Sequence, residues 1–253
     1  MIGRFRRLET TVVRNGEDIK AFFDGCFDDY ISKHGHSERV LTYRLGLIEK
    51  AAQPGADDAV LDIGCGIGHY LIAMAKSIGR GVGIDFSDHM VEAASERANE
   101  SPWGAKLSFR IDDAEELRTI SDSSVDVAMC IGALEHMPKK DRVLSSAHRV
   151  LKQGGRLVLM TPNGGYVWYR FIAPVLELDT KHLSTDTFLE GRAISRLLHR
   201  AGFRDVSIGW WTFIPRGDMH PVLNTILQVL DRAGRFFRIP SLRGGLIVTA
   251  CRP

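Results

Sequence analysis

The sequence predicts a doubly wound α/β domain around a mostly parallel, seven-stranded sheet. Seven short apolar runs rich in Val, Leu and Ile are typical of buried strands. From residue 59 onward most of them alternate with amphipathic stretches of about 10–15 residues, which indicates βαβ units with helices on both faces of the sheet. A glycine-rich turn follows the first run, at the edge where such sheets bind ligands.

The elements follow one another in a simple order. Residues 17–35 and 37–53 predict two helices. The second carries an apolar stripe near the helical period, formed by Val40, Leu41, Leu45 and Ile48. Pro54 and Gly55 end this helical pattern. The expected strands cover residues 59–64, 81–85, 107–113, 124–133, 155–163, 203–211 and 244–253. The expected helices among them cover residues 70–79, 87–100, 140–152 and 186–202.

The composition is that of an ordinary globular protein. The 253 residues are 44% hydrophobic and 25% charged, with a formal net charge of +2, too mild to indicate a nucleic-acid surface. The four cysteines Cys26, Cys65, Cys130 and Cys251 form no CxxC pair, so we expect reduced thiols, no metal site and a cytoplasmic protein. We find no signal-peptide pattern, and no run approaches the roughly 18 apolar residues of a membrane span.

Three glycines at alternate positions, Gly64, Gly66 and Gly68, follow the first expected strand. Such a cluster indicates a tight turn, or a ligand that lies directly against the backbone. The dinucleotide fingerprint G-x-G-x-x-G fails here, because its last position is His69 or Leu71. The phosphate-binding P-loop fails as well, since no Lys-Ser or Lys-Thr follows the glycines.

Residues 62–68 instead read D-x-G-x-G-x-G, and four later segments complete a pattern. They are GVGIDFS at 81–87, RIDDAEEL at 110–117, VDVAMCIGALEHMP at 125–138 and HRVLKQGGRLVLMTPN at 148–163. In this order they resemble the class I S-adenosylmethionine (SAM)-dependent methyltransferases, in particular the small-molecule branch with the ubiquinone-biosynthesis O-methyltransferases. The resemblance runs from about residue 30 to the C-terminus and is strongest over 58–163. It implies a Rossmann-like methyltransferase fold that binds S-adenosyl-L-methionine and releases S-adenosyl-L-homocysteine.

The resemblance also implies which residues hold the cofactor. Asp62 matches the acidic residue that helps to hold the methionine portion. Asp85 lies 23 positions later, where a carboxylate can accept hydrogen bonds from both ribose hydroxyls. Asp113, with Asp112 as the near alternative, matches the residue that faces the adenine amino group. The other expected cofactor-binding residues are Tyr30, Ile63, Gly64, Cys65, Gly66, Gly68, Phe86, Ser87, Met90, Ala114, Cys130, Ile131 and Gly132.

Glu135 and His136 are the candidate catalytic residues. Methyl transfer from a sulfonium is a direct displacement, so a base is needed only where the acceptor atom must lose a proton. A similar Leu-Glu-His stretch occurs in the ubiquinone-type O-methyltransferases. We expect His136 to accept a hydroxyl proton and Glu135 to orient it or to help hold a metal ion; alternatively, both only maintain the loop. Weaker candidates for the pocket wall are Phe23, His34, His36 and His182.

The expected acceptor is a small or lipid-like molecule that is methylated at a hydroxyl oxygen. Nucleic acid is disfavoured, because the Asn/Asp-Pro-Pro-Tyr/Phe and Pro-Cys motifs are absent and the basic residues are dispersed. Two alternatives stay open: N- or C-methylation of a sugar or natural product, and a SAM-binding protein that does no chemistry. We expect a monomer or a homodimer.

A single domain is expected over 1–253, with an N-terminal helical cap at 1–52, a SAM-binding core at 58–163 and a substrate-side half at 164–253. This half contains an insertion at 214–243 that is far longer than a hairpin loop. The insertion predicts a helix that packs on the domain or a second subunit, or that receives a hydrophobic acceptor or a membrane surface. Its apolar and basic residues are Val222, Leu223, Ile226, Leu227, Leu230, Ala233, Phe237, Arg232, Arg235, Arg238 and Arg243.

Overall fold

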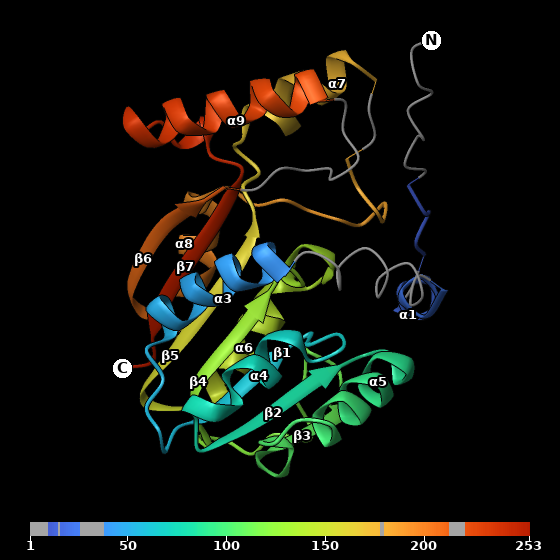
Figure 1. The fold of residues 1–253 in the computed structure, drawn as a ribbon, viewed down its shortest axis with the longest axis vertical. Helices are drawn as coiled ribbons and strands as arrows, with labels where there is room; N and C mark the ends of the chain where they lie inside the picture. Colours follow the sequence, from blue (N-terminus) through green and yellow to red (C-terminus); the bar gives the residue numbers. More distant parts are fainter. Residues whose placement is uncertain (1–9, 15, 26–37, 178–179, 213–220) are drawn as a thin grey trace.

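Seven strands form one sheet in the order β3-β2-β1-β4-β5-β7-β6 (Figure 1). The computed structural model describes residues 10–14, 16–25, 38–177, 180–212 and 221–253, and their side chains except those of 38–40 and 221–224. The first five strands in this order are parallel, whereas β7 is antiparallel to both of its neighbours. The strands are β1 (Ala59–Ile63), β2 (Arg80–Asp85), β3 (Leu107–Ile111), β4 (Val125–Ile131), β5 (Leu151–Pro162), β6 (Arg204–Trp211) and β7 (Gly245–Cys251).

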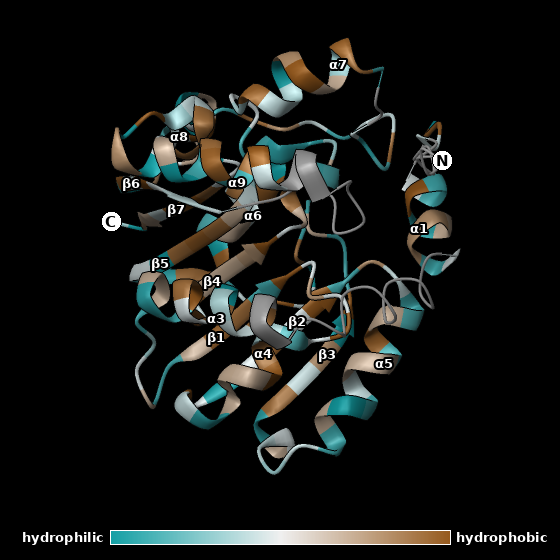
Figure 2. Ribbon diagram, turned by 45° about the horizontal axis from the view of Figure 1, so that its top comes forward, coloured by the Kyte–Doolittle hydropathy of each residue, from teal (hydrophilic) through white to brown (hydrophobic). Residues whose placement is uncertain are grey.

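Helices cover both faces of this sheet. α3 (Glu38–Ala52) and α4 (His69–Met74) pack on one face, and α6 (Lys140–Val150) and α8 (Gly191–Arg200) pack on the other. The adjacent β1 residues Val60 and Leu61 belong to these two opposite cores, and both are fully buried. In Figure 2 the central strands are mostly brown, and teal residues lie mainly on the helices and loops around them. The prediction of a doubly wound, mostly parallel sheet is confirmed.

The other helices lie at the two ends of the sheet. α5 (Asp88–Asn99) packs beside β2 and β3, and α1 (Gly16–Gly25) contacts α5. At the other end, the π-helical turn η4 (Trp168–Ile172) and α7 (Ala173–Val175) lie near α9 (Pro221–Phe236) (Figure 1). Four 3-10 turns also connect described elements, and one of them, η3 (Leu134–His136), bears on the site. Within the described parts of the chain, no helix combines the length and the apolar character that a bilayer span requires.

The strand order places the site. β1 pairs with β2 on one side and with β4 on the other, so the chain leaves β1 in one direction and returns to it from the opposite one. Loops that follow such neighbouring strands diverge and leave a crevice at the carboxyl ends of the strands. The loops after β1, β2 and β4 carry most of the residues that the sequence assigned to the site.

One expected helix is shorter than its pattern. The sequence predicts a helix over 186–202, but α8 begins at Gly191. The reason is the side chain of Asp186, which accepts hydrogen bonds from the backbone N–H groups of His182 and Leu183 and holds the chain in a turn. The backbone N–H of Thr187 then donates to the carbonyl of Glu135, so this stretch belongs to the site rather than to a helix.

The insertion before β7 is fixed to the sheet by a buried ion pair. Arg243 Nε donates to Asp231 Oδ1 at 2.9 Å, and the Thr212 hydroxyl donates to the other carboxylate oxygen at 2.7 Å. The side-chain amide of Asn163 donates to the carbonyl oxygens of Arg243 and Pro240. α9 is thereby held at the end of β5 and of the β6–β7 pair.

Only one side of the expected apolar stripe of α9 packs inward. Leu227 is buried and Leu230 half-buried, and both contact a cluster formed by Tyr166, Trp168 and Ala173. Ile226 and Phe237 are exposed, by contrast. The side chains of Val222 and Leu223 lie outside the described residues. Packing on the domain therefore accounts for part of the stripe and leaves the rest uncovered.

Replacing Asp231 with alanine should lower the free energy of unfolding by about 3 kcal/mol, because Arg243 is left buried without its partner. Urea denaturation followed by circular dichroism measures the loss. The matched control is Glu190→Ala, which breaks an ion pair with Arg170 whose side chains are 53% and 60% exposed. The control should cost no more than about 1 kcal/mol. An equal cost for both variants would contradict the anchoring role.

Candidate functional site

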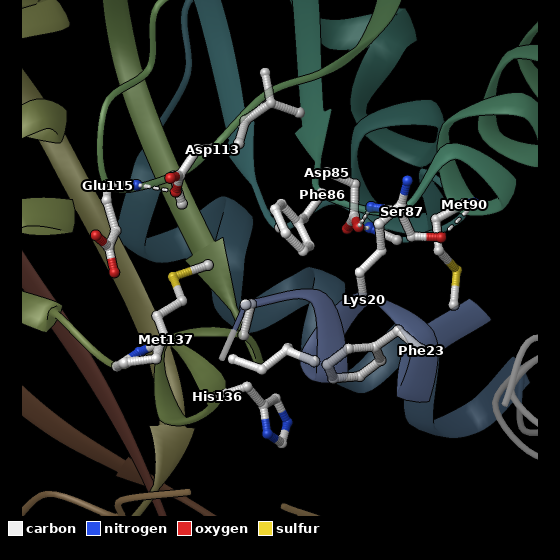
Figure 3. Close-up of a pocket in the computed structure, with 18 of the residues that line it drawn as sticks. Lys20, Phe23, Asp85, Phe86, Ser87, Met90, Asp113, Glu115, His136 and Met137 are labelled. Atoms are coloured by element: carbon white, nitrogen blue, oxygen red, sulfur yellow. Dashed lines mark hydrogen bonds between the residues drawn. The ribbon is translucent and has the colours of Figure 1, made fainter. Parts of the chain in front are cut away.

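A cavity of about 470 Å³ opens at the carboxyl ends of β1, β2 and β4, within the roughly 300–1,000 Å³ typical of small-molecule sites. One face of α1 lies over it, formed by Gly16, Ile19, Lys20 and Phe23 at helical spacing. Figure 3 shows the labelled side chains around this space. The lining residues that the sequence assigned to the site are Phe23, Gly64, Gly66, Asp85, Phe86, Ser87, Met90, Asp112, Asp113, Ala114, Ile131, Gly132 and His136.

The glycine loop adopts a backbone that only glycine accepts without strain. Gly64, Gly66 and Gly68 have φ values of 71°, 51° and 73°, all in the left-handed region. Gly132, after β4, has a φ of 68°, and a Cβ atom built there would meet nothing within 4 Å. The walls of the cavity at Gly66 and Gly132 are therefore bare backbone, against which a ligand can lie closely.

Asp85 joins the glycine loop to the start of α5. Its Oδ2 accepts a hydrogen bond from the N–H of Gly66 at 2.8 Å, and its Oδ1 accepts one from the N–H of Ser87 at 3.0 Å. Burial raises the pKa of the Asp85 carboxyl, although these two N–H groups oppose the shift. Each oxygen retains a second lone pair, so the carboxylate can still accept from a ligand.

Ser87 caps α5 and also holds α1 in place. Its hydroxyl accepts from the N–H of Met90 at 3.2 Å and donates to the Asp24 carboxylate at 2.5 Å. Lys20 forms an ion pair with Asp88 at 3.0 Å. These contacts fasten α1 across the mouth of the cavity, next to the end of β2.

Asp62 lies behind the glycine loop instead of on the cavity wall. The residue is buried, and its Oδ2 has no hydrogen-bond partner among the described residues. Burial, together with the nearby charge of Asp85, raises the pKa of Asp62 to about 8. A buried oxygen without a partner at this position is a group that a bound ligand or water would satisfy.

Four other predicted cofactor-binding residues do not line the cavity: Ile63, Cys65, Gly68 and Cys130. Cys65 and Cys130 are buried, and burial raises the pKa of both thiols. Protonated buried thiols are poor nucleophiles, so the two cysteines pack the strand ends. Tyr30, like His34 and His36, lies outside the described residues.

Asp112 and Asp113 differ in what their carboxylates already bind. Asp112 accepts from the N–H groups of Asp113, Arg118 and Thr119 and from the Thr119 hydroxyl, so it organises the loop after β3. Asp113 accepts only from the N–H of Glu115, among the described residues, and is exposed to the cavity. The geometry favours Asp113 over Asp112 as the ligand-facing carboxylate.

His136 is paired with a carboxylate that the sequence analysis did not identify. Its Nδ1 lies 2.7 Å from Oδ1 of Asp186, whose side chain is fully buried. Burial disfavours the charged imidazole, but the hydrogen bond with Asp186 and the charge of Glu135 outweigh it and raise the pKa of His136. The Asp186 pKa is lowered, because its hydrogen bonds with His136 and two backbone N–H groups overcome the effect of burial.

Asp186, and not Glu135, forms the hydrogen bond with His136, and a role of Glu135 in orienting the ring stays a prediction. Glu135 is buried, and its Oε2 accepts a hydrogen bond from the Thr161 hydroxyl at 3.1 Å. Burial raises the pKa of Glu135. Its side chain therefore ties η3 to β5, next to the hydrogen-bonded pair of His136 and Asp186, which we call the dyad. The described residues include no group of three or more His, Cys, Asp and Glu side chains arranged to hold a metal ion.

Aromatic side chains surround the dyad. The rings of Phe23 and His182 lie 5.3 Å and 6.1 Å from that of His136. The segment that carries His182 also pairs with residues 10–14, which we call the N-terminal strap. The N–H of Thr11 donates to the His182 carbonyl at 2.9 Å. No pattern in the sequence pointed to this strap, whereas Phe23 was expected as a candidate for the pocket wall.

The residues of the cavity fit the cofactor that the sequence resemblance implies. Asp85, at the end of β2, offers a carboxylate that can accept hydrogen bonds from a ribose diol. Asp113 offers one for an exocyclic amino group. The unpartnered oxygen of Asp62 suits a cationic amino group, and glycine backbone lines the cavity at Gly66 and Gly132, with open space beside Gly132.

The family comparison identifies a domain over most of this region. The methyltransferase domain family matches residues 54–202, which span β1 to α8. The 27-O-demethylrifamycin SV methyltransferase of Amycolatopsis mediterranei is 42% identical over 105 residues, 41% of this chain and 38% of that protein. A ubiquinone biosynthesis O-methyltransferase of Xanthomonas axonopodis pv. citri is 30% identical over 173 residues, 65% of this chain and 70% of that protein.

The chain spans about half the length of the first curated relatives that it matches, between 38% and 52%. Among solved structures, the cyclase SpnF superposes with a TM-score of 0.71 over 97% of this chain and 99% of its own, at 18% identity. That likeness shows the shared fold alone. With the family match over more than half of its length, the chain belongs to the methyltransferase domain family of SAM-dependent, Rossmann-like enzymes.

Proposed function

We propose that the protein transfers the methyl group of S-adenosylmethionine to a hydroxyl oxygen of a small-molecule or lipid-like acceptor. The observation that carries this proposal is the His136–Asp186 dyad beside the cavity. A hydroxyl oxygen is a weak nucleophile unless its proton is removed as the new bond forms, whereas a neutral amine nitrogen can attack without prior loss of a proton. N- or C-methylation of a sugar or natural product, and cofactor binding without chemistry, are the alternatives that the experiments below separate.

When bound, SAM supplies a methyl group on a positively charged sulfur. Asp85 would accept hydrogen bonds from the ribose hydroxyls, and Asp113 would accept one from the adenine amino group. Gly66 and Gly132 would permit close contact with the backbone. Ser87 and Asp112 would position these cofactor-binding groups. Phe86, Met90, Ala114 and Ile131 would form walls of the cofactor cavity.

His136 would accept the acceptor proton at Nε2. The hydrogen bond to Asp186 assigns the proton of the neutral ring to Nδ1, which leaves the Nε2 lone pair available. Asp186 also stabilises the imidazolium that forms, as a buried carboxylate does in other base dyads. Phe23 and Met137 line the cavity near His136 and would help to exclude water (Figure 3).

The size of the cavity and the charge pattern bear on the kind of acceptor. A cavity of small-molecule size and dispersed basic residues support a small or lipid-like acceptor rather than nucleic acid. We also propose one domain over 1–253, divided as the sequence indicates, a cytoplasmic location with peripheral membrane contact through 222–243, and a monomer or homodimer. The sequence pattern supports these proposals, and the continuous sheet supports the single domain.

An acceptor screen that follows S-adenosylhomocysteine release tests the proposed function directly. Phenols, aliphatic alcohols, amines and carbon acids should be offered as separate pools, each with and without a lipid-like tail. Release confined to the hydroxyl pools is the expected result. Release with amines or carbon acids only would replace the proposal with its N- or C-methylating alternative, and cofactor binding without any release would favour the non-catalytic one.

Replacing Asp85 with alanine should weaken S-adenosylhomocysteine binding roughly 100-fold, because losing a charged acceptor shared by two hydroxyls costs about 3 kcal/mol. Titration calorimetry measures this change. Glu92→Ala, an exposed carboxylate on α5, is the matched control and should leave the affinity unchanged. Unchanged binding by Asp85→Ala would remove Asp85 from the cofactor site.

His136→Ala should lower kcat by about 100- to 10,000-fold, the range for losing a general base, while cofactor affinity is retained. In the unaltered protein the rate should rise with pH through the raised pKa of His136, since only the neutral imidazole accepts a proton. Asp186→Asn removes the main interaction that raises this pKa, so the rise should move to lower pH, with a reduced plateau.

Proton NMR titration of the His136 ring gives a second readout for Asp186→Asn that does not depend on activity. The pKa of His136 should fall in this variant, whereas Asp205→Asn, at an exposed position of β6, should not change it. If the rate of methyl transfer depended on pH identically in the unaltered protein, in Asp186→Asn and in Asp205→Asn, a base role for His136 would be contradicted.

A further inference from the structure

Exposed apolar side chains gather on two elements that are distant in sequence. Fourteen large hydrophobic side chains among the described residues are exposed, and eight of them lie within 171–176 and 226–239. We call this set the apolar patch. The two segments touch, because η4, α7 and α9 share a buried cluster that includes Ala173 and Leu227. The patch consists of Phe171, Val175, Leu176, Ile226, Val229, Phe236, Phe237 and Ile239.

α9 has an inner and an outer apolar side. Leu227, Asp231 and Gly234 are buried and mark the inner side, which carries the ion pair with Arg243. At 100° per residue, Val229 and Phe236 fall on the opposite side of the helix, and Ile226 lies on its flank, 100° from Leu227. Phe236 is 81% exposed and Val229 56% exposed. The inner contacts already hold the helix, so the outer apolar residues have no role in its packing.

Positive charge borders the apolar patch. Arg170, Arg232, Arg235 and Arg238 are exposed. Arg170 pairs with the exposed Glu190, and Glu177 is the single exposed acid among the described residues of 168–177 and 225–240. Asp231 is buried in its ion pair. A second copy of this chain that docked patch to patch would bring these arginines together. The charge therefore favours an anionic occupant over a dimer.

We propose that the apolar patch and its arginines dock on an anionic lipid bilayer. Phe and Ile side chains enter the boundary between head groups and acyl chains, and arginines beside them reach the lipid phosphates. α9 suits this role because its inner side is held by the contacts of Asp231 with Arg243 and Thr212, which leave its outer side at the surface. The docking gives the peripheral membrane contact proposed above for 222–243 a defined surface and lipid charge, and it does not depend on methyl transfer.

The position of the patch gives the docking a use. From Leu176, at the patch, the chain runs within ten residues to Asp186, which holds His136. Thr185, beside Asp186, lines the cavity. A bilayer bound at the patch would therefore lie at the acceptor end of the molecule, where a lipid-like acceptor would leave the membrane; this clause alone rests on the proposed function.

Sedimentation with vesicles tests the proposal. The full chain should pellet with phosphatidylcholine vesicles that contain phosphatidylglycerol, and far less with phosphatidylcholine alone. Arg232→Gln with Arg238→Gln should lower the partition coefficient about 25-fold at low salt. Phe236→Ser with Phe237→Ser should lower it by at least about tenfold. Arg192→Gln with Arg196→Gln removes the same charge from the exposed side of α8 and should change nothing.

Thermal unfolding and S-adenosylhomocysteine affinity, unchanged in every variant, would show that the fold is intact. If the phenylalanine variant unfolds, the arginine pair still decides, because those side chains are on the surface. Absence of binding to anionic vesicles at low salt, or equal binding by the patch variants and the α8 control, would overturn the proposal. A dimer in sedimentation equilibrium that the patch variants dissociate would assign the surface to a second copy instead.

Discussion

The hydrogen bond from the N–H of Gly66 to the carboxylate of Asp85 is the contact on which the site depends. It joins the loop after β1 to the end of β2, and the same carboxylate also receives the N–H of Ser87 at the start of α5. A carboxylate held by two backbone N–H groups is oriented by the fold rather than by side-chain packing. The left-handed glycines make this approach possible, so the loop and the acid require each other.

A second organising element is the stretch 181–187. Its backbone pairs with the N-terminal strap at Thr11, its Asp186 fixes His136, and its Thr187 N–H reaches the carbonyl of Glu135. One short segment thus connects the covering of the cavity to the proposed base. Because Asp186 uses its second oxygen on its own backbone, the dyad and the turn are stabilised by the same side chain.

The sequence alone was enough to predict the sheet, its two-sided burial and the family, because strand and helix periodicity and the glycine motif are local signals. It also located Asp85, Asp113 and His136, which follow strands at the expected edge. It could not identify Asp186, since a contact across 50 residues leaves no periodic trace and the residue lay inside an expected helix. The sequence resemblance suggested Glu135 as the orienting acid, whereas the carboxylate bonded to the His136 ring is that of Asp186, and Glu135 accepts from Thr161.

Asp62 has a consequence for the thermodynamics of binding. A carboxyl with a pKa of about 8 is mostly protonated at neutral pH, and its neighbour Asp85 helps to keep it so. A cation that came to lie against its unpartnered oxygen would favour the ionised form and expel the proton into solution. The heat measured on binding would then include the protonation of the buffer, and would differ between phosphate and Tris while the affinity at a fixed pH stayed the same.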